Sequence, residues 1–189
     1  MPAKKRNTPT AVYQLKITLK GSRPPIWRRV LVADDTTLAK LNHIIQIAMG
    51  WTNSHLHDFT IQGQRYSEPS PDDWEPVKDE RRYKLNQLVT AAKFKFVYQY
   101  DFGDSWDHEI LVEKILPPEP GAHYPVCATG KRACPPEDAG GVWGYATFLE
   151  AINDPSHEEH EMYLEWIGGG FDPEAFNLDR VNAWLRQVR

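Results

Sequence analysis

The feature that most constrains the fold is residues 93–116, where apolar and polar side chains alternate along two consecutive segments. Every second residue in 94–100 is aromatic, and residues 106–113 largely repeat the alternation with acidic residues on the polar side. A period of two is typical of a half-buried β-strand. Only residues 102–105 separate the two segments, which predicts a β-hairpin with Gly103 in its strained turn position.

Other segments add strands and a helix to this hairpin. The alternation of residues 11–20 and 26–32 predicts a second hairpin, and residues 55–63 predict a further strand. Residues 38–49 carry apolar side chains at helical spacing, which predicts an amphipathic helix packed on the sheet. Residues 67–82 are rich in proline and charge, and they predict a long surface loop.

The last third of the chain shows helical patterns. Residues 144–153 have an apolar stripe at helical spacing, and Ser156 with Glu159 matches the capping box of a helix that extends to Trp166. A terminal helix is expected from Leu178 onward. We therefore predict an α+β fold with a largely antiparallel β-sheet packed against helices and a helical C-terminal third.

Length and composition predict one domain. The chain has 189 residues, 41% of them hydrophobic, which is enough for one core without disulfide bonds. Residues 1–10 are polar and basic, and we expect them to be disordered ahead of a single domain over residues 11–189. The sequence has no run of ~18 apolar residues and no secretory signal pattern. Two cysteines suit a reducing compartment, so we expect a cytoplasmic protein.

Charge is unevenly distributed along the chain. Residues 1–97 hold 16 Lys or Arg and 9 Asp or Glu, whereas residues 98–172 hold 3 and 15. The acidic half argues against a simple duplex-DNA binder, because phosphate contacts need basic side chains. If DNA is bound, we expect the basic half to bind it, through Lys4, Lys5, Arg6, Arg28, Arg29, Arg81 and Arg82.

The predicted hairpin turn holds an unusual cluster of titratable residues, namely Asp101, Asp104, Asp107 and His108. Carboxylates crowded in a turn raise one another's pKa unless a cation lies between them. A divalent metal or a general acid/base role would use this arrangement. The alternative is structural: the aspartates accept backbone N–H bonds in an Asx turn, and His108 is a hydrogen-bonded strand histidine.

A second candidate constellation is His55-x-His57. On a strand, residues two apart point the same way, so both imidazoles can reach one ion. A metal site would combine them with Asp101, Asp104 and His108. The alternative is two histidines with separate hydrogen-bond partners.

Cys127 and Cys134 allow three interpretations: free thiols, half of a zinc site or a redox pair. The loop that follows places Glu137 and Asp138 just before a helix, where the helix dipole favours acidic groups, or it is a plain connection. It lacks the lysine of a phosphate-binding loop, so nucleotide binding by that route is excluded.

Several motifs in order along the chain resemble the plasmid pRiA4b Orf-3-like family. The resemblance implies a single compact α+β domain of a kind found in bacteria and archaea, often on plasmids or near mobile elements, with no established biochemical activity. It therefore implies no catalytic residues. The motifs are IWRRVLV (26–32), MGW (49–51), HLHDF (55–59), YQYDFGDSWDHEI (98–110), CATGKRACPPEDAGG (127–141) and FDPEAFNLD (171–179).

These observations lead to two functional hypotheses. The first is a binding domain that contacts a protein or, with less support, a nucleic acid through an aromatic and acidic surface. The second is a metal-dependent hydrolase or nuclease that uses the His/Asp cluster and a divalent metal. The residues expected to form the surface are Tyr100, Asp101, Asp104, Trp106, His108, Glu137 and Asp138.

Overall fold

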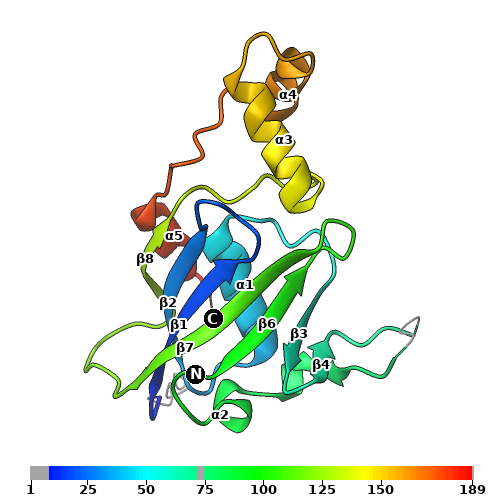
Figure 1. The fold of residues 1–189 in the computed structure, drawn as a ribbon. Helices are drawn as coiled ribbons and strands as arrows, with labels where there is room; N and C mark the ends of the chain where they lie inside the picture. Colours follow the sequence, from blue (N-terminus) through cyan, green and yellow to red (C-terminus); the bar gives the residue numbers. More distant parts are fainter. Residues whose placement is uncertain (1–8, 72–74, 189) are drawn as a thin grey trace, which may run out of the picture.

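The computed structural model describes residues 9–71 and 75–188, and this part of the chain has a mixed α+β fold (Figure 1). Its eight-stranded sheet has the order β5-β4-β3-β6-β7-β1-β2-β8. All neighbouring strands are antiparallel except β4 and β5. The strands are β1 (Val12–Leu19), β2 (Trp27–Ala33), β3 (His57–Ile61), β4 (Gln64–Ser67), β5 (Lys78–Asp79), β6 (Lys95–Tyr100), β7 (Trp106–Leu116) and β8 (Val126–Lys131).

The central hairpin β6–β7 follows the predicted alternation. Tyr98 and Tyr100 on β6 are fully buried, and so are His108, Ile110 and Val112 on β7. The polar residues between them point to the other side of the sheet, because successive side chains of a strand alternate between its faces. The core therefore lies on one face of a twisted sheet.

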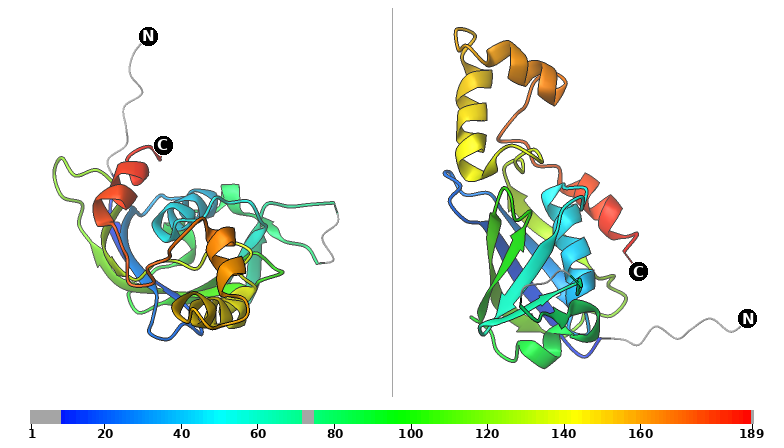
Figure 2. Two further views of the ribbon diagram at one scale, coloured as in Figure 1. Left: turned by 90° about the horizontal axis from the view of Figure 1, so that it is seen from above. Right: turned by 90° about the vertical axis from the view of Figure 1, so that its right-hand side faces the viewer.

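Helix α1 (Leu38–Met49) fills the concave face of this sheet, which curls around it (Figure 2). Thr37 caps its first turn by accepting a hydrogen bond from the Lys40 amide, and Gly50 ends it with a φ of 105°. A left-handed conformation of this kind favours glycine. Burial of Leu38, Leu41, Ile44 and Ile45 against the strands holds the helix in place.

The remaining helices lie outside this layer. Helix α5 lies beside α1 and β8, whereas α3 and α4 pack on each other and project beyond one end of the sheet (Figure 1, Figure 2). None of the helices in the described chain has the length and apolar character that crossing a bilayer requires. The remaining elements are η1 (Glu80–Arg82), α2 (Leu85–Leu88), α3 (Gly141–Asn153), α4 (His160–Ile167) and α5 (Leu178–Leu185).

The structure corrects the predicted hairpin turn and the capping box. Gly103 does not have a positive φ; Asp101 and Ser105, each with a φ of 54°, take the left-handed positions instead. Ser156 donates to Asp154, and α4 begins after Glu159 without a side-chain cap. A capping box was therefore the wrong interpretation of this segment.

The structure also bears on two further predictions, the helical last third of the chain and the disorder of residues 1–10. Strand β8 was not predicted, so the last third of the chain contains a strand as well as α3, α4 and α5. Residues 1–8 lie outside the described part of the chain, and the predicted disorder of 1–10 stays a prediction. Thr10 donates to Asp34 through both its amide and its hydroxyl.

Candidate functional site

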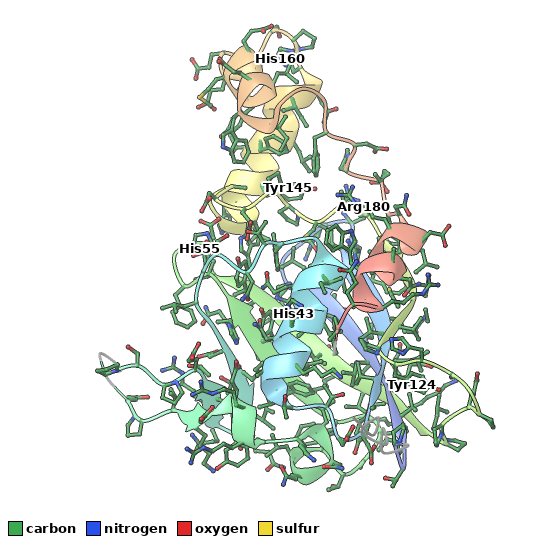
Figure 3. The ribbon with its side chains drawn as sticks, turned by 180° about the vertical axis from the view of Figure 1, so that it is seen from behind. His43, His55, Tyr124, Tyr145, His160 and Arg180 are labelled. Atoms are coloured by element: carbon green, nitrogen blue, oxygen red, sulfur yellow. The ribbon has the colours of Figure 1, made fainter. Side chains whose placement is uncertain are left out.

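Three segments distant in sequence meet at the end of the sheet nearest α3. They are the 50–56 segment after α1, the 101–105 turn of the central hairpin and the 134–140 segment before α3. Figure 3 shows His55 in this region, below the lower end of α3. We call His55, Asp101 and Asp138, which these segments bring together, the rim site.

The rim site has the geometry of a small metal-ligand group. His55 Nε2 lies 3.0 Å from Asp138 Oδ1 and 3.6 Å from Asp101 Oδ2. One ligand atom from each of the three residues lies within 4.8 Å of the others. One imidazole nitrogen and two carboxylate oxygens form a donor set that zinc and manganese both accept.

The backbone holds both aspartates of the rim site in uncommon conformations. Asp101 has a φ of 54° and Asp138 a φ of 60°, which few residues other than glycine adopt. Asp101 Oδ1 accepts the amides of Gly103 and Asp104 at 3.0 and 3.4 Å, so the Asx-turn alternative holds for this oxygen. Its second oxygen, Oδ2, is the one that faces His55.

Two glycines fix the 134–140 segment against the hairpin turn. The Gly140 amide donates to Asp104 Oδ2 at 3.0 Å. A Cβ atom at Gly141 would lie only 2.4 Å from the backbone oxygen of Asp104, so this approach requires glycine. Asp104 therefore positions the loop that carries Asp138.

Glu137 fixes the opposite side of the same loop. Its Oε1 accepts the Tyr100 hydroxyl at 2.5 Å, and its Oε2 accepts the Thr52 hydroxyl at 2.5 Å. The Ser54 amide donates to the Tyr100 oxygen at 3.0 Å. Burial, reinforced by the Glu137 carboxylate, raises the pKa of Tyr100, so its hydroxyl remains a donor at neutral pH.

Three residues of the predicted binding surface lie inside the protein. Tyr100, Trp106 and His108 are each at most 1% exposed, so a partner cannot contact them directly. The ring of Trp51 lies over this group, 4.9 Å from Tyr100 and 6.0 Å from Trp106 between centroids. These buried rings support the rim site from inside the protein. The prediction that they form an exposed aromatic surface is therefore wrong.

The predicted metal-ligand set is also corrected. His57 Nε2 lies 2.8 Å from Glu80 Oε2, away from the rim site, and His108 is buried. Neither ring nitrogen of His108 has a hydrogen-bond partner in the described chain. Burial lowers the pKa of His108 to about 4, and the nearby carbonyls of Tyr98 and Trp106 oppose only part of this effect.

Sequence reasoning missed one pairing and two residues of this region. It included Asp138 in the expected surface but not among the metal ligands, although Asp138 is the nearer carboxylate to His55. It did not single out Thr52, which binds Glu137, or Glu80, which binds His57. The signal for Asp138 was the pair of glycines that follows it, because such a pair permits close approach of another backbone.

The two cysteines are free thiols. Burial raises the pKa of Cys127 to about 11, and burial also raises the pKa of Cys134 well above its usual range. Both sulfurs therefore stay protonated at neutral pH, which disfavours thiolate chemistry.

The predicted DNA-binding residues are not a free basic surface. Arg28 is 2% exposed, and Arg29 forms a bidentate ion pair with Glu113. Arg81 and Arg82 both pair with Asp79. The other predicted contacts, Lys4, Lys5 and Arg6, lie outside the described residues.

These features define a class of protein: a mixed α+β domain with a sheet curled around one helix and an Asp/His site at the sheet's end. The chain belongs to the family described as plasmid pRiA4b ORF-3-like protein, whose sequence profile matches residues 11–180. This confirms the resemblance inferred from its motifs.

Two relatives extend over nearly the whole chain. An uncharacterised protein from Sinorhizobium fredii, y4hQ, is 40% identical over 190 residues, covering 95% of this chain and 97% of that protein. The crystal structure of MM3350 from Methanosarcina mazei Go1, a protein of unknown function, is 40% identical and superimposes with a TM-score of 0.85. The match covers 93% of this chain and 98% of MM3350. Neither relative has an established activity.

Proposed function

We propose that this protein is a binding domain whose site is a divalent-metal centre formed by His55, Asp101 and Asp138. The observation that carries the proposal is the convergence of the three ligand atoms within 4.8 Å. Ligand bonds of ~2.0–2.2 Å place neighbouring ligand atoms of a tetrahedral site about 3.3–3.6 Å apart. The separations of 3.0 and 3.6 Å from His55 Nε2 lie close to this range, and the two aspartate oxygens lie within 4.8 Å of each other.

The backbone supports the same interpretation. Aspartate is among the non-glycine residues that adopt a positive φ most readily, and both rim-site aspartates have one. This conformation directs two carboxylates toward one imidazole. Three protein ligands leave coordination positions open for an oxygen atom of a partner.

The surroundings of the metal centre favour a protein partner over a nucleic acid. Leu56 is 72% exposed and directly follows His55, and Phe102 is 42% exposed and directly follows Asp101. Trp143, in the first turn of α3, is 86% exposed. Large apolar side chains exposed around a polar centre are typical of protein interfaces.

The proposal is tested by metal titration of protein purified without a histidine tag and dialysed against chelator. We expect calorimetry to detect one Zn²⁺ or Mn²⁺ per chain. Asp138→Asn and His55→Ala should each weaken binding by at least roughly 10-fold to 100-fold, which is the loss seen when residues that only support a metal ligand are changed. A raised melting temperature with metal should accompany binding.

The matched control is Asp107→Asn. Asp107 is an acid of the same hairpin, and it lies near Lys20 rather than in the rim site. Its replacement should leave the metal affinity unchanged. Equal losses in the Asp107 and Asp138 variants, or no metal binding by the unmodified protein, would contradict the proposal.

A second candidate function is metal-dependent hydrolysis, favoured by the position of Glu137. This carboxylate directly precedes Asp138 and is held by Thr52 and Tyr100, so it could accept a proton from a metal-bound water. Hydrolysis of bis(p-nitrophenyl) phosphate by the Mn²⁺-loaded protein tests this function. Glu137→Gln should abolish turnover and retain the metal; turnover that survives the substitution, or no turnover at all, rules it out.

A further inference from the structure

A separate cavity of about 830 Å³ lies between the end of α1, the segment after β8 and helix α5. One face of α5 lines it through Asn177, Arg180, Val181 and Trp184, which recur at helical spacing. Figure 3 shows Arg180 on the opposite side of the end of α1 from His55. The cavity is therefore distinct from the rim site. Trp51 and Thr52, which line the cavity, separate the two.

The most unusual residue in the cavity wall is Arg28. Its side chain is 2% exposed, yet no carboxylate of the described chain pairs with it. Its Nε donates to the Ala48 carbonyl, and Nη1 donates to the carbonyls of Trp27 and Lys131. Nη2 donates to no atom of the described residues. It is also not fully buried, because it is absent from the set of buried side-chain atoms that lack a partner.

A buried cation without an anion is costly. Carbonyl oxygens satisfy hydrogen bonds of the guanidinium, but they leave its full positive charge in a medium of low dielectric constant. Burial accordingly lowers the pKa of Arg28. The planar guanidinium keeps its charge at neutral pH all the same, and the N–H groups of Nη2 remain to donate to an anion.

The rest of the cavity wall has the same sign of charge. Arg180 is the only other charged side chain of the described residues that lines it, and no Asp or Glu does. This is unexpected in a chain with a net charge of −4. A cavity with two cations and no acid concentrates anions.

Apolar surfaces complete the wall. The Phe176 ring lies 4.4 Å from Arg28 Cζ, and the Trp184 indole is 55% exposed beside the opening. Cavities of ~300–1,000 Å³ with an apolar lining and a few placed polar groups are typical small-molecule sites. An inorganic anion alone would leave most of this volume unused.

We propose that this cavity binds a small organic anion, whose charged group pairs with Arg28 and Arg180 and whose apolar body packs on Phe176 and Trp184. Neither the family assignment nor the rim site accounts for this arrangement. The proposal is independent of metal binding, because none of the rim-site ligands lines the cavity.

A matched pair of fluorescent probes tests the proposal. The anion 8-anilinonaphthalene-1-sulfonate and the neutral N-phenyl-1-naphthylamine share one aromatic body and differ in the sulfonate. We expect the full-length protein to bind the anion at least tenfold more tightly. The folded state should be the species that binds, so the anion should also raise the melting temperature.

Three variants localise the binding. Arg180→Gln, on the exposed side of α5, should weaken the anion several-fold and leave the neutral probe unchanged. The control is Arg186→Gln, at the end of the same helix but outside the cavity wall, and it should bind both probes normally. Arg28→Met should remove most of the preference for the anion. Circular dichroism will show whether this variant remains folded, and Arg180→Gln decides the outcome if it does not.

Competition then identifies the charged group. Displacement of the bound probe by octanoate and not by octyl phosphate assigns a carboxylate ligand, and the reverse result assigns a phosphate. Equal affinity for the two fluorescent probes, or displacement by neutral octanol as effective as by either anion, overturns the proposal. So does an Arg180→Gln variant that behaves like the Arg186→Gln control.

Discussion

At the scale of single residues, His108 shows how chemistry and pattern can point in different directions. Its imidazole next to Asp107 suggested a metal ligand, but the alternation places it on the side of Ile110 and Val112. The structure follows the alternation, and His108 is fully buried. The alternation of a strand determines to which face of the sheet a side chain points. The chemistry of the side chain shows only what the residue could bind if it pointed toward a site.

Burial of His108 predicts a specific dependence of stability on pH. Its pKa is lowered to about 4 in the folded protein from 6.5, so the unfolded chain binds the proton more readily. The stability that the neutral His108 contributes is fully present above pH 6.5 and is lost as the pH falls toward 4. The free energy of unfolding falls by roughly 3 kcal/mol in total over this interval. We expect His108→Leu to flatten this part of the profile in urea unfolding measured at several pH values.

The control for this prediction is His43→Gln on the exposed face of α1. It should keep the full loss of stability between pH 6.5 and 4. If His108→Leu and unmodified protein lose stability in parallel over that interval, His108 is not the group that titrates. Carboxylates also titrate near pH 4 and change the stability of every variant. The effect of His108 is therefore taken from the difference in unfolding free energy between variants at each pH.

The rim site could be predicted only in part from the sequence. His55 and Asp101 stood out because the chemistry of their motifs is unusual for a strand end and a turn. Asp138 was expected on the same surface as Asp101, but its contact with His55 was not predicted, because that contact depends on left-handed backbone at two aspartates and on packing between segments distant in sequence. Such contacts arise from tertiary packing, which local propensity does not encode.

At the scale of elements, the strands and helices with a strong period were predictable. The β6–β7 hairpin and α1 have their predicted positions because apolar periodicity and burial agree in them. Strand β8 was missed because its sequence, VCATGK, has little alternation and follows a Pro/Gly-rich segment. It becomes a strand because the edge of β2 is available for pairing.

The junction between the hairpin turn and α3 yields the second prediction. Gly141 has a φ of 68°, and an added Cβ would overlap the Asp104 backbone oxygen. We expect Gly141→Ala to lower the free energy of unfolding by roughly 1–3 kcal/mol, the cost of one strained backbone position. Urea denaturation of the variant measures this change directly.

Gly170→Ala provides the matched control. Gly170 has an ordinary φ, and no heavy atom lies within 4 Å of the Cβ it would gain. This substitution should change the unfolding free energy by no more than about 0.5 kcal/mol, as for other surface positions. Similar losses in the two variants would show that close approach at residue 141 is not what joins α3 to the turn.

At the scale of the whole molecule, the fold consists of a sheet wrapped around α1 and a projecting helical pair. The sheet, α1, α5 and the buried side of α3 belong to one apolar cluster, although α3 and α4 project beyond the end of the sheet (Figure 1). Helix α4 has no fully buried residue. The pair is stabilised by aromatic contacts around Phe148, which is fully buried.

This arrangement predicts that the helical pair opens without the sheet. The Phe148 ring lies 5.4 Å from that of Tyr163 and 5.6 Å from that of Trp166. Phe148→Ala should cost the pair about 3–5 kcal/mol, the usual loss for a buried phenylalanine. Hydrogen exchange followed by mass spectrometry should therefore show amides of α3 and α4 exchanging at least a hundredfold faster, because local opening governs exchange there.

Strands β1, β6 and β7 should keep their exchange rates in the same variant, since α3 and α4 project beyond the end of the sheet and the contacts that Phe148 makes with Tyr163 and Trp166 lie within the helical pair. Trp143→Ala is the control on the same helix, because Trp143 is almost fully exposed and should affect neither set of amides. Acceleration spread evenly over the strands and the helical pair would mean that both belong to one cooperative unit. Faster exchange confined to α3 and α4 would mean that the helical pair opens independently, while the loop that carries Asp138 stays attached to the hairpin turn through Gly140 and Glu137.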